Sequence, residues 1–384
     1  IIASDLLLIV SPVTFGGYSS DTKRAMDRII GLISPFFAVV DGEVHHRPRY
    51  KRFPAMAALG INHDNCGRCK EIFKTLLFRN AINFHTPSLA VTVVGEDETS
   101  EPRINHRVAE LLDNVRNSVF AQLRERRIHR NEIEVERRSE QLAHPGNQES
   151  KRALLLIGSP KVRSTSSSIG DELSSRLSSR GWHAESMRIL PAVSSEAKWR
   201  ALTGALKSAQ LVAIISPLYV DSLPAPVTKA LELIAADVDG GSSTSGKGLL
   251  AVLNNGVPEA AHSHTALAIA RQFAMETGYQ WMGGLALGMG GGIDGKPLTK
   301  IGRMAKHIMK SLDLTAAALD QGKPIPADAE VLMARPLMPR WLYTSVGNWG
   351  WKKQAKKNGV RDIINARPFE SDPTKPPVGG TAAQ

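Results

Sequence analysis

Short apolar runs alternate with longer amphipathic segments along most of the chain, which is the pattern of strands alternating with helices. The apolar runs predict buried strands at Leu6–Val10, Met56–Leu59, Leu89–Val94, Leu154–Ile157, Ala184–Ile189, Leu211–Ile215, Leu249–Leu253 and Leu285–Leu287. Apolar positions at helical spacing predict helices at Asp21–Leu32, Lys70–Arg79, Ile104–Arg127, Gly170–Arg180, Pro226–Ala235, Ser263–Thr277 and Thr299–Leu319. Such strict alternation indicates an α/β protein with parallel sheets and right-handed crossovers.

One strand-loop-helix segment occurs twice in the chain. SDLLLIVSPVTFGGYSSDTKRAMDRII at 4–30 returns as AQLVAIISPLYVDSLPAPVTKALELIA at 209–235. Each copy is an apolar strand ending in Ser-Pro, then a short polar loop, then a helix that opens near a lysine. Only the second copy is preceded by a further strand and a polar turn, ALLLIGSPKVRSTSSS at 153–168.

This asymmetry predicts two doubly wound parallel sheets of order 2-1-3-4-5, the first lacking its opening β-α-β unit. The predicted division is an incomplete domain at 1–127, a linker at 128–150, a complete domain at 151–325 and a C-terminal extension at 326–384. The strand at Leu6–Val10 would then present an apolar edge to solvent, which favours aggregation. We expect chain preceding Ile1, or another chain, to cover this edge; a half-sized domain is the alternative.

Composition narrows the class of protein. The length of 384 residues allows two well-filled cores. No run approaches the roughly 20 apolar residues that span a bilayer, so we expect no membrane partner. Two cysteines form no disulfide framework, which favours a reducing compartment and predicts a cytoplasmic protein.

The formal net charge of +11 is concentrated in HHRPRYKR at 45–52, RERRIHR at 124–130 and KKQAKK at 352–357. A positive field attracts nucleic acid, anionic lipid or phosphorylated cofactors without choosing among them. Aromatic residues make up only 5% of the chain and are not interleaved with arginines, unlike single-strand binders. Solvated basic faces are therefore favoured over nucleic-acid binding.

A hydroxyl-rich loop, GSPKVRSTSS at 158–167, lies between an apolar strand and a helix. Free N–H groups at a helix start attract anions, and Lys161 and Arg163 add positive charge. Neither GxGxxG nor GxxxxGK[ST] is present, so the loop suits a phosphate monoester. The alternative is that these hydroxyls only cap the helix.

Three loops leave the carboxyl ends of strands in the second half: 159–167, PLYVDSLP at 217–224 and NNGVPE at 254–259. Ligands of open α/β sheets bind at this edge. Tyr219 could lie against a flat ring, and Asn254, Asn255 and Gly256 could bond its heteroatoms. The alternative for Tyr219 is packing.

These residues resemble the flavodoxin-like NAD(P)H-dependent FMN reductases and multimeric flavodoxin-like flavoproteins. The likeness lies in GSP-x3-S-x-S at 158–166, SPLYVDSLPAPVTKALE at 216–232 and FAMETGYQWMGGLALGMGG at 273–291. In the first half, SPVTFGGYSSDTKRAMDRI and DGEVHHRPRYKRFP look like the same superfamily, in tandem.

The resemblance implies FMN bound at the three loops. The implied cofactor contacts are Ser159, Pro160, Arg163, Ser164, Ser166 and Ser167 near the phosphate, Pro217, Leu218, Tyr219 and Val220 near the ring, and Asn255 and Gly256 in the third loop.

The resemblance also implies a reaction. FMN would take a hydride from NADH or NADPH and pass two electrons to a quinone, nitroaromatic or similar small acceptor. Such a cycle needs no catalytic acid or base, so we predict no catalytic side chain, and expect loop N–H groups to stabilise the reduced ring. The expected partners are these two small molecules, with a homo-oligomer or tandem-domain association. A flavodoxin-type electron carrier and a non-enzymatic scaffold are the alternatives.

His63, Cys66 and Cys69 form a possible metal or redox motif, since two cysteines at CxxC spacing precede a predicted helix. The alternative is a pair of ordinary thiols beside a helix start. Glu43 with His45-His46 offers a second metal-capable group, although an ordinary loop is favoured there. We therefore predict no metal.

Two further segments have simpler interpretations. The GMGGG stretch at 288–292 could approach a ligand closely, but a turn is favoured. Trp341, Trp349 and Trp351 near the C-terminus indicate packing or a subunit contact.

Overall fold

The second half of the chain forms a five-stranded parallel sheet. The structure, a computed structural model, describes residues 1–63, 66–122 and 151–370. The sheet order is β8 (His183–Arg188), β7 (Arg152–Ile157), β9 (Leu211–Pro217), β10 (Gly248–Asn254) and β11 (Gln280–Leu287). This is the doubly wound order 2-1-3-4-5 of the flavodoxin-like fold, so the predicted fold class is confirmed.

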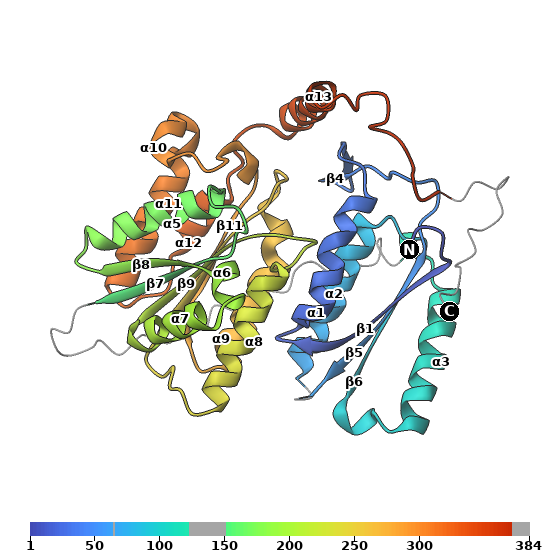
Figure 1. The fold of residues 1–384 in the computed structure, drawn as a ribbon, viewed down its shortest axis with the longest axis horizontal. Helices are drawn as coiled ribbons and strands as arrows, with labels where there is room; N and C mark the ends of the chain where they lie inside the picture. The colour runs from blue at the N-terminus through green and yellow to red at the C-terminus, as the bar shows by residue number, and fades with distance from the viewer. Residues whose placement is uncertain (64–65, 123–150, 371–384) are drawn as a thin grey trace.

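Helices cover both faces of this sheet (Figure 1). Alternate residues of β7 point to opposite faces: Leu154 and Leu156 join one buried cluster and Leu155 joins the other. The first face packs against α6 (Ile189–Val193), α7 (Glu196–Ser208), α8 (Ala225–Asp239) and α9 (His264–Glu276). The second packs against α5 (Thr165–Ser178), α11 (Lys306–Asp320) and α12 (Ala327–Ala334). The sequence pattern did not predict α6, α7 or α12.

The first half contains a smaller parallel sheet of β1 (Leu6–Thr14), β5 (Ala55–Asn62) and β6 (Leu89–Gly95). Its helices are α1 (Ser20–Asp27) and α2 (Gly67–Asn83) on one face and α3 (Glu101–Asn117) on the other. A separate antiparallel hairpin joins β3 (Phe37–Val40) to β4 (Glu43–His46), where the sequence indicated an ordinary loop.

The outer edge of β1 is largely open in the described part of the chain. Only β2 (Gly17–Tyr18) pairs there, opposite Val13 and Thr14. Leu8 and Val10 are therefore 46% and 52% exposed. Their counterparts in β9, Ala213 and Ile215, are fully buried because α5 packs over that face of the second sheet, and the described first half has no matching helix. Among the described residues, the first sheet thus has no counterpart of the opening strand, helix and strand of the second, as predicted.

Helices α1 and α2 of the first half pack against α8 and α9 of the second, and these four helices lie between the two sheets (Figure 1). Two carboxylates cap helix starts across this contact. Glu232 accepts from the N–H of Ser20 at 2.7 Å, and Asp27 accepts from the N–H of Ala225 at 2.9 Å. Ser20 and Ala225 are 205 positions apart, as are Asp27 and Glu232. Such reciprocal contacts are those of a two-fold axis.

The turn before each of these helices has the same backbone. Phe15 and Gly16 have φ values of 52° and 83°, and Val220 and Asp221, again 205 positions later, have 47° and 56°. Two successive positive φ values define the tight turn that reverses a chain in register. Both copies of the repeated segment therefore fold alike.

Two predicted helices are interrupted. The helix expected at Ile104–Arg127 ends at Asn117, because Ser118 is extended and the N–H of Phe120 bonds the Pro87 carbonyl, which buries the Phe120 ring. The helix expected at Thr299–Leu319 is α10 (Leu298–Ile301), a 3₁₀ turn and then α11, because Gly302 adopts a φ of +70°.

Some predictions fall outside the described residues, namely the linker at 128–150, the basic cluster at 124–130 and the tail beyond 370. The remaining domain boundaries stay predictions. No helix within the described ranges combines the length and apolar character needed to cross a membrane.

We predict that Asp27→Ala lowers the free energy of unfolding by about 3 kcal/mol, because it removes a helix cap and leaves the buried Lys23 without its carboxylate partner. Glu232→Ala removes a cap with its Ser20 hydroxyl bond and an exposed pair with Lys229 but leaves no buried charge unpaired, so it should cost about 1 kcal/mol. Urea unfolding of both variants measures these losses. Glu196→Ala, which breaks an exposed pair with Arg200, is the control and should change little. Equal effects in all three variants would contradict the capping argument.

Candidate functional site

The loop after β7 ends in a fixed helix start. Ser164 is the N-cap of α5: its Oγ accepts from the N–H of Ser167 at 3.1 Å, and its own N–H donates to the Ser167 hydroxyl at 2.9 Å. This capping box uses both hydroxyls within the chain. The N–H groups of the first turn that follows have no acceptor inside the helix, and the helix dipole is positive there.

Ser159 and Ser166 are the loop's unsatisfied donors. Their side chains are 4% and 1% exposed, and each hydroxyl oxygen accepts a bond: Ser159 from the N–H of Lys161 at 3.3 Å, Ser166 from the Asn254 amide at 2.9 Å. Neither hydroxyl hydrogen meets an acceptor among the described residues. Buried donors of this kind suit an anion placed against the loop.

Three cations surround the same loop. The side chains of Lys161 and Arg163 are exposed and form no ion pair with any described residue. Arg188, at the end of the neighbouring strand β8, donates to the Pro160 carbonyl at 2.7 Å, while its buried Nε has no partner in the described chain. A guanidinium N–H without a partner can donate to a phosphate or a carboxylate bound at this loop. Arg188 was not among the predicted site residues, although its position at a strand end is a usable signal.

The loop after β9 presents the residues expected at the ring. Pro217, Leu218 and Val220 are half-buried, and Tyr219 is 36% exposed at the corner of the turn. The N–H of Tyr219 and the carbonyl of Ser222 close that turn at 2.9 Å.

Asn254 connects all three loops. Its side-chain amide donates to the Ser166 hydroxyl and to the Ser216 carbonyl at 3.0 Å, and its own carbonyl accepts from the N–H of Leu218 at 2.8 Å. Ser166 of the first loop and Leu218 of the second therefore both bond Asn254 at the carboxyl edge of the sheet.

The third loop, 254–259, is held by hydrogen bonds between its own residues. The side chain of Asn255 accepts from the N–H of Val257 at 3.0 Å and donates to the carbonyl of Glu259 at 3.0 Å. Gly256 is exposed, and its carbonyl accepts from the hydroxyl of Tyr343. Asn255 thus shapes this loop, while the backbone of Gly256 faces the surface.

The glycine-rich stretch after β11 does more than turn the chain. The carbonyl of Gly290 accepts from the Thr165 hydroxyl at 2.6 Å, and its N–H donates to Asn255. Gly295 has a φ of +73°, and a side chain there would approach the backbone of Arg163 to 2.9 Å. This stretch therefore joins the first and third loops.

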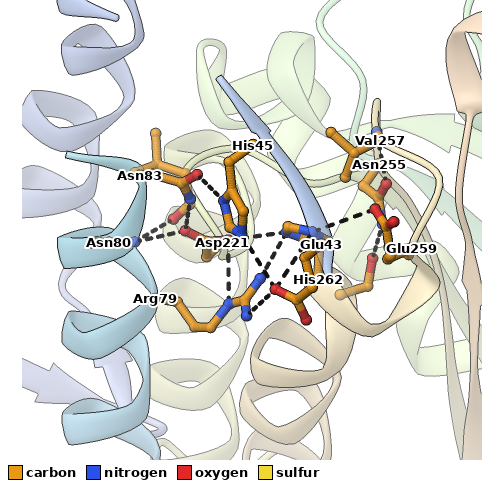
Figure 2. Close-up of polar contacts among 12 residues, drawn as sticks. Glu43, His45, Arg79, Asn80, Asn83, Asp221, Asn255, Val257, Glu259 and His262 are labelled. Atoms are coloured by element: carbon orange, nitrogen blue, oxygen red, sulfur yellow. Dashed lines mark hydrogen bonds and ion pairs between the residues drawn. The ribbon is translucent and has the colours of Figure 1, made fainter. Parts of the chain in front are cut away.

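The first half holds the loop after β9 in place (Figure 2). Asn80 and Asn83 of α2 donate to the buried Asp221 carboxylate at 3.2 and 2.6 Å, and Asn80 also donates to the Val220 carbonyl. The fully buried Lys23 of α1 donates to the Tyr219 carbonyl at 2.8 Å and pairs with Asp27. Three successive residues of the loop are thus bonded from the other half.

Lys23, Asn80 and Asn83, together with Arg79, form what we call the anchor of this loop. Arg79 links the anchor to the β3–β4 hairpin. It donates to Glu43 at 2.6 Å and to Nδ1 of His262 at 2.8 Å, and its Nε lies 3.9 Å from Asp221 (Figure 2). Burial raises the pKa of Asp221, but the neighbouring His262 imidazole and the Arg79 charge outweigh burial, so this pKa lies below its ordinary value. Burial lowers the pKa of Lys23, partly offset by Asp27.

The group of Glu43, His45 and His262 is close enough to bind a metal ion, but its bonding favours an ion-pair network. Since Nδ1 of His262 accepts from Arg79, a neutral imidazole carries its hydrogen on Nε2 and offers no lone pair there. The Arg79 guanidinium also balances the charge of Glu43. His45 bonds Asn83 at 2.8 Å and so helps to orient the anchor.

The thiols and tryptophans differ from the sequence interpretation. His63 lies beside Glu96 at 3.4 Å, whereas Glu276 is the third group near Cys66 and Cys69. Trp341 and Trp349, on α13 (Arg340–Lys357), are 69% and 63% exposed, so they are not packed within the described chain, and the subunit contact stays a prediction.

No known protein-family model matches the sequence, and no curated protein matches it. Solved structures that are similar include a putative quinone reductase from Klebsiella pneumoniae, with a TM-score of 0.34 and 15% identity over 46% of this chain and 88% of that one. An FMN-dependent NADH-azoreductase from Bacillus anthracis has a TM-score of 0.32 and 14% identity over 44% and 100%. A flavodoxin from the domain Archaea has a TM-score of 0.28 and 16% identity over 42% and 98%.

We predict that Asp221→Asn lowers the free energy of unfolding by about 3 kcal/mol at neutral pH, because the largely buried Arg79 loses a counter-charge. The depressed pKa of Asp221 favours its ionised form in the folded state. Its contribution is therefore complete above about pH 4 and is lost as the pH falls through the lower folded-state value. Urea unfolding from pH 7 to pH 3 should show the two proteins converging in acid. A constant difference at all pH values would contradict this assignment.

Proposed function

We propose that the chain is an FMN-dependent oxidoreductase that passes two electrons from NADH or NADPH to a small acceptor such as a quinone or a nitroaromatic. The observation that carries the proposal is the cradle at the start of α5. There the buried hydroxyls of Ser159 and Ser166 have unused hydrogens, and the buried Nε of Arg188 lacks a partner. Each of these is a donor suited to a phosphate monoester.

The second support is the placement of a rigid backbone loop beside that cradle. Asn254 bonds Ser166 on one side and Ser216 on the other, so the phosphate end and the ring end of the site are held by one side chain. Pro217 to Val220 would lie along the ring, with the N–H groups of Leu218 and Tyr219 already bonded to the carbonyls of Asn254 and Ser222. When bound, FMN supplies the hydride and electron chemistry itself.

The role of the protein is then to bind and orient. Ser159, Ser166, Arg163 and Arg188 would hold the phosphate, while Lys23 and Asn80 keep the carbonyls of the ring loop turned into the contact between the halves. A loop fixed in this way loses little conformational freedom when the ring binds, which favours affinity.

We infer that the two halves are tandem copies with different tasks. The first half has the turn and helix that match the ring side but no counterpart of the 158–167 loop among the described residues. Its contribution is the anchor formed by Lys23, Arg79, Asn80 and Asn83. We therefore propose one flavin per chain, in the second half.

The proposal predicts that the purified protein binds FMN at one equivalent, measured by quenching of flavin fluorescence. Ser166→Ala and Arg188→Ala each remove one donor to a charged group, which is worth roughly 1.5–3 kcal/mol, so each should weaken binding about 10- to 100-fold. Ser178→Ala, at the exposed far end of α5, is the matched control for Ser166 and should bind normally. A wild-type protein that takes up no FMN would refute the proposal.

The electron donor is tested separately on the FMN-loaded protein. Oxidation of NADPH or NADH that depends on added quinone supports a reductase. Flavin reduction only by a protein or chemical reductant, with no nicotinamide oxidation, would point to a flavodoxin-type carrier instead.

A further inference from the structure

The first turn of α2 carries two thiols that the proposed flavin site does not use. Cys66 is the N-cap residue of this helix, and its Sγ accepts from the N–H of Cys69 at 3.2 Å. The two sulfur atoms and the Glu276 carboxylate all lie within 4.8 Å of one another. Residues three apart in a first helical turn are close enough for their sulfurs to be bridged, as in CxxC redox motifs.

The two thiols have different surroundings. Cys66 is half-buried and can be reached from solvent, and its sulfur also accepts from the Gln272 amide at 3.5 Å. Cys69 is 2% exposed, and its thiol donates to Glu276 at 3.3 Å. Burial raises the pKa of the Cys69 thiol, and the nearby Cys66 and Glu276 raise it further. Cys69 is therefore held protonated beside a carboxylate that can accept its proton.

Gln272 and Glu276 of α9 complete this cluster from the other half of the chain. Gln272 is 5% exposed and donates to Glu276 at 2.8 Å, which keeps the carboxylate next to Cys69. The Gln272 Oε1 has no hydrogen-bond partner in the described part of the chain. A buried acceptor without a hydrogen-bond partner is costly. A substrate thiol released at Cys66 would supply the hydrogen that the Gln272 Oε1 lacks.

We propose that Cys66 and Cys69 form a redox-active dithiol that reduces small-molecule disulfides. In the first step the Cys66 thiolate attacks one sulfur of the substrate disulfide, so that a mixed disulfide forms and one substrate thiolate leaves. In the second step Cys69 gives its proton to Glu276 and attacks the Cys66 sulfur, which forms the Cys66–Cys69 disulfide and releases the second thiolate. The two electrons lost by the cysteine pair are those gained by the substrate.

This centre is separate from the proposed flavin site. Cys66 begins α2, whereas Asn80, which contacts the ring loop, lies 14 residues further along the same helix. A helical rise of 1.5 Å per residue puts about 20 Å between these two levels. The dithiol would therefore exchange electrons with a diffusing disulfide and needs no flavin.

The test uses the full-length protein and glutathione disulfide as the probe. Wild-type protein equilibrated in glutathione redox buffers, trapped by alkylation and weighed by mass spectrometry should lose both free thiols together, and dithiothreitol should restore both. Cys69→Ser should stop as a mixed disulfide carrying one glutathionyl group. Cys66→Ser should remain unmodified, because Cys69 is buried.

Glu276→Gln tests the proton acceptor. This exposed position tolerates substitution, and the loss of the base should slow the second step at least tenfold, so that the mixed disulfide accumulates transiently. Glu71→Gln, which alters an exposed carboxylate of α2 paired with Lys74, is the matched control and should resolve at the wild-type rate.

Two outcomes would overturn the proposal. The first is two free thiols in the wild-type protein at every glutathione ratio. The second is one equivalent of zinc bound through both thiols in the purified protein, with metal removal leaving the thiols unable to form a disulfide. Either result leaves the flavin proposal untouched, because FMN binding is measured independently.

Discussion

The reciprocal capping of α1 by Glu232 and of α8 by Asp27 is the contact on which the candidate site depends. Helix α8 begins at Ala225, directly after the loop that runs from Pro217 to Pro224. Fixing the N–H of Ala225 with Asp27 therefore fixes one end of that loop, and β9 fixes the other. Lys23, one turn before Asp27 on α1, then bonds the Tyr219 carbonyl from the same side. A helix cap and a buried cation thus position a backbone turn, and the turn positions the proposed ring contacts.

The two copies of the repeated segment hold their turns by different interactions. At matching places in the turn, the second half has the buried carboxylate of Asp221 and the first half has Gly16. Any side chain on Gly16 would meet Ile72 at 2.6 Å, and the adjacent Phe15 packs edge-on against Phe273. One turn is therefore held by an ion-pair network and the other by apolar packing. The Asp221 carboxylate is costly to bury without its partners from the first half. This cost favours the contact between the two halves.

Sequence patterns predicted those features that depend on neighbours along the chain. The strands, the hydroxyl-rich loop before α5 and the open edge of β1 follow from local apolar periodicity and from the repeat. The anchor of Asp221 does not, because its amide donors Asn80 and Asn83 lie 141 and 138 positions away and their partner is chosen by helix packing. The hairpin of β3 and β4 was not predicted for a similar reason, because its Phe37 packs against Tyr343, which is distant in the sequence. The break at Ser118 depends on a carbonyl from another loop.

The described first half has no counterpart of the 158–167 loop, and this difference leaves room there for the proposed dithiol. In the second half, Asn254 of the loop after β10 bonds Ser166 in the 158–167 loop, and Asn255 bonds Gly290. The corresponding place in the first half, after β5, has no such loop to join in the described chain, and the segment there is free to carry Cys66 and Cys69 at the start of α2. The partners of these thiols come from α9, as the partners of Asp221 come from α2. Each half thus supplies side chains to the strand-end loop of the other, and the two-fold contact that aligns the helices decides which residues meet at both places.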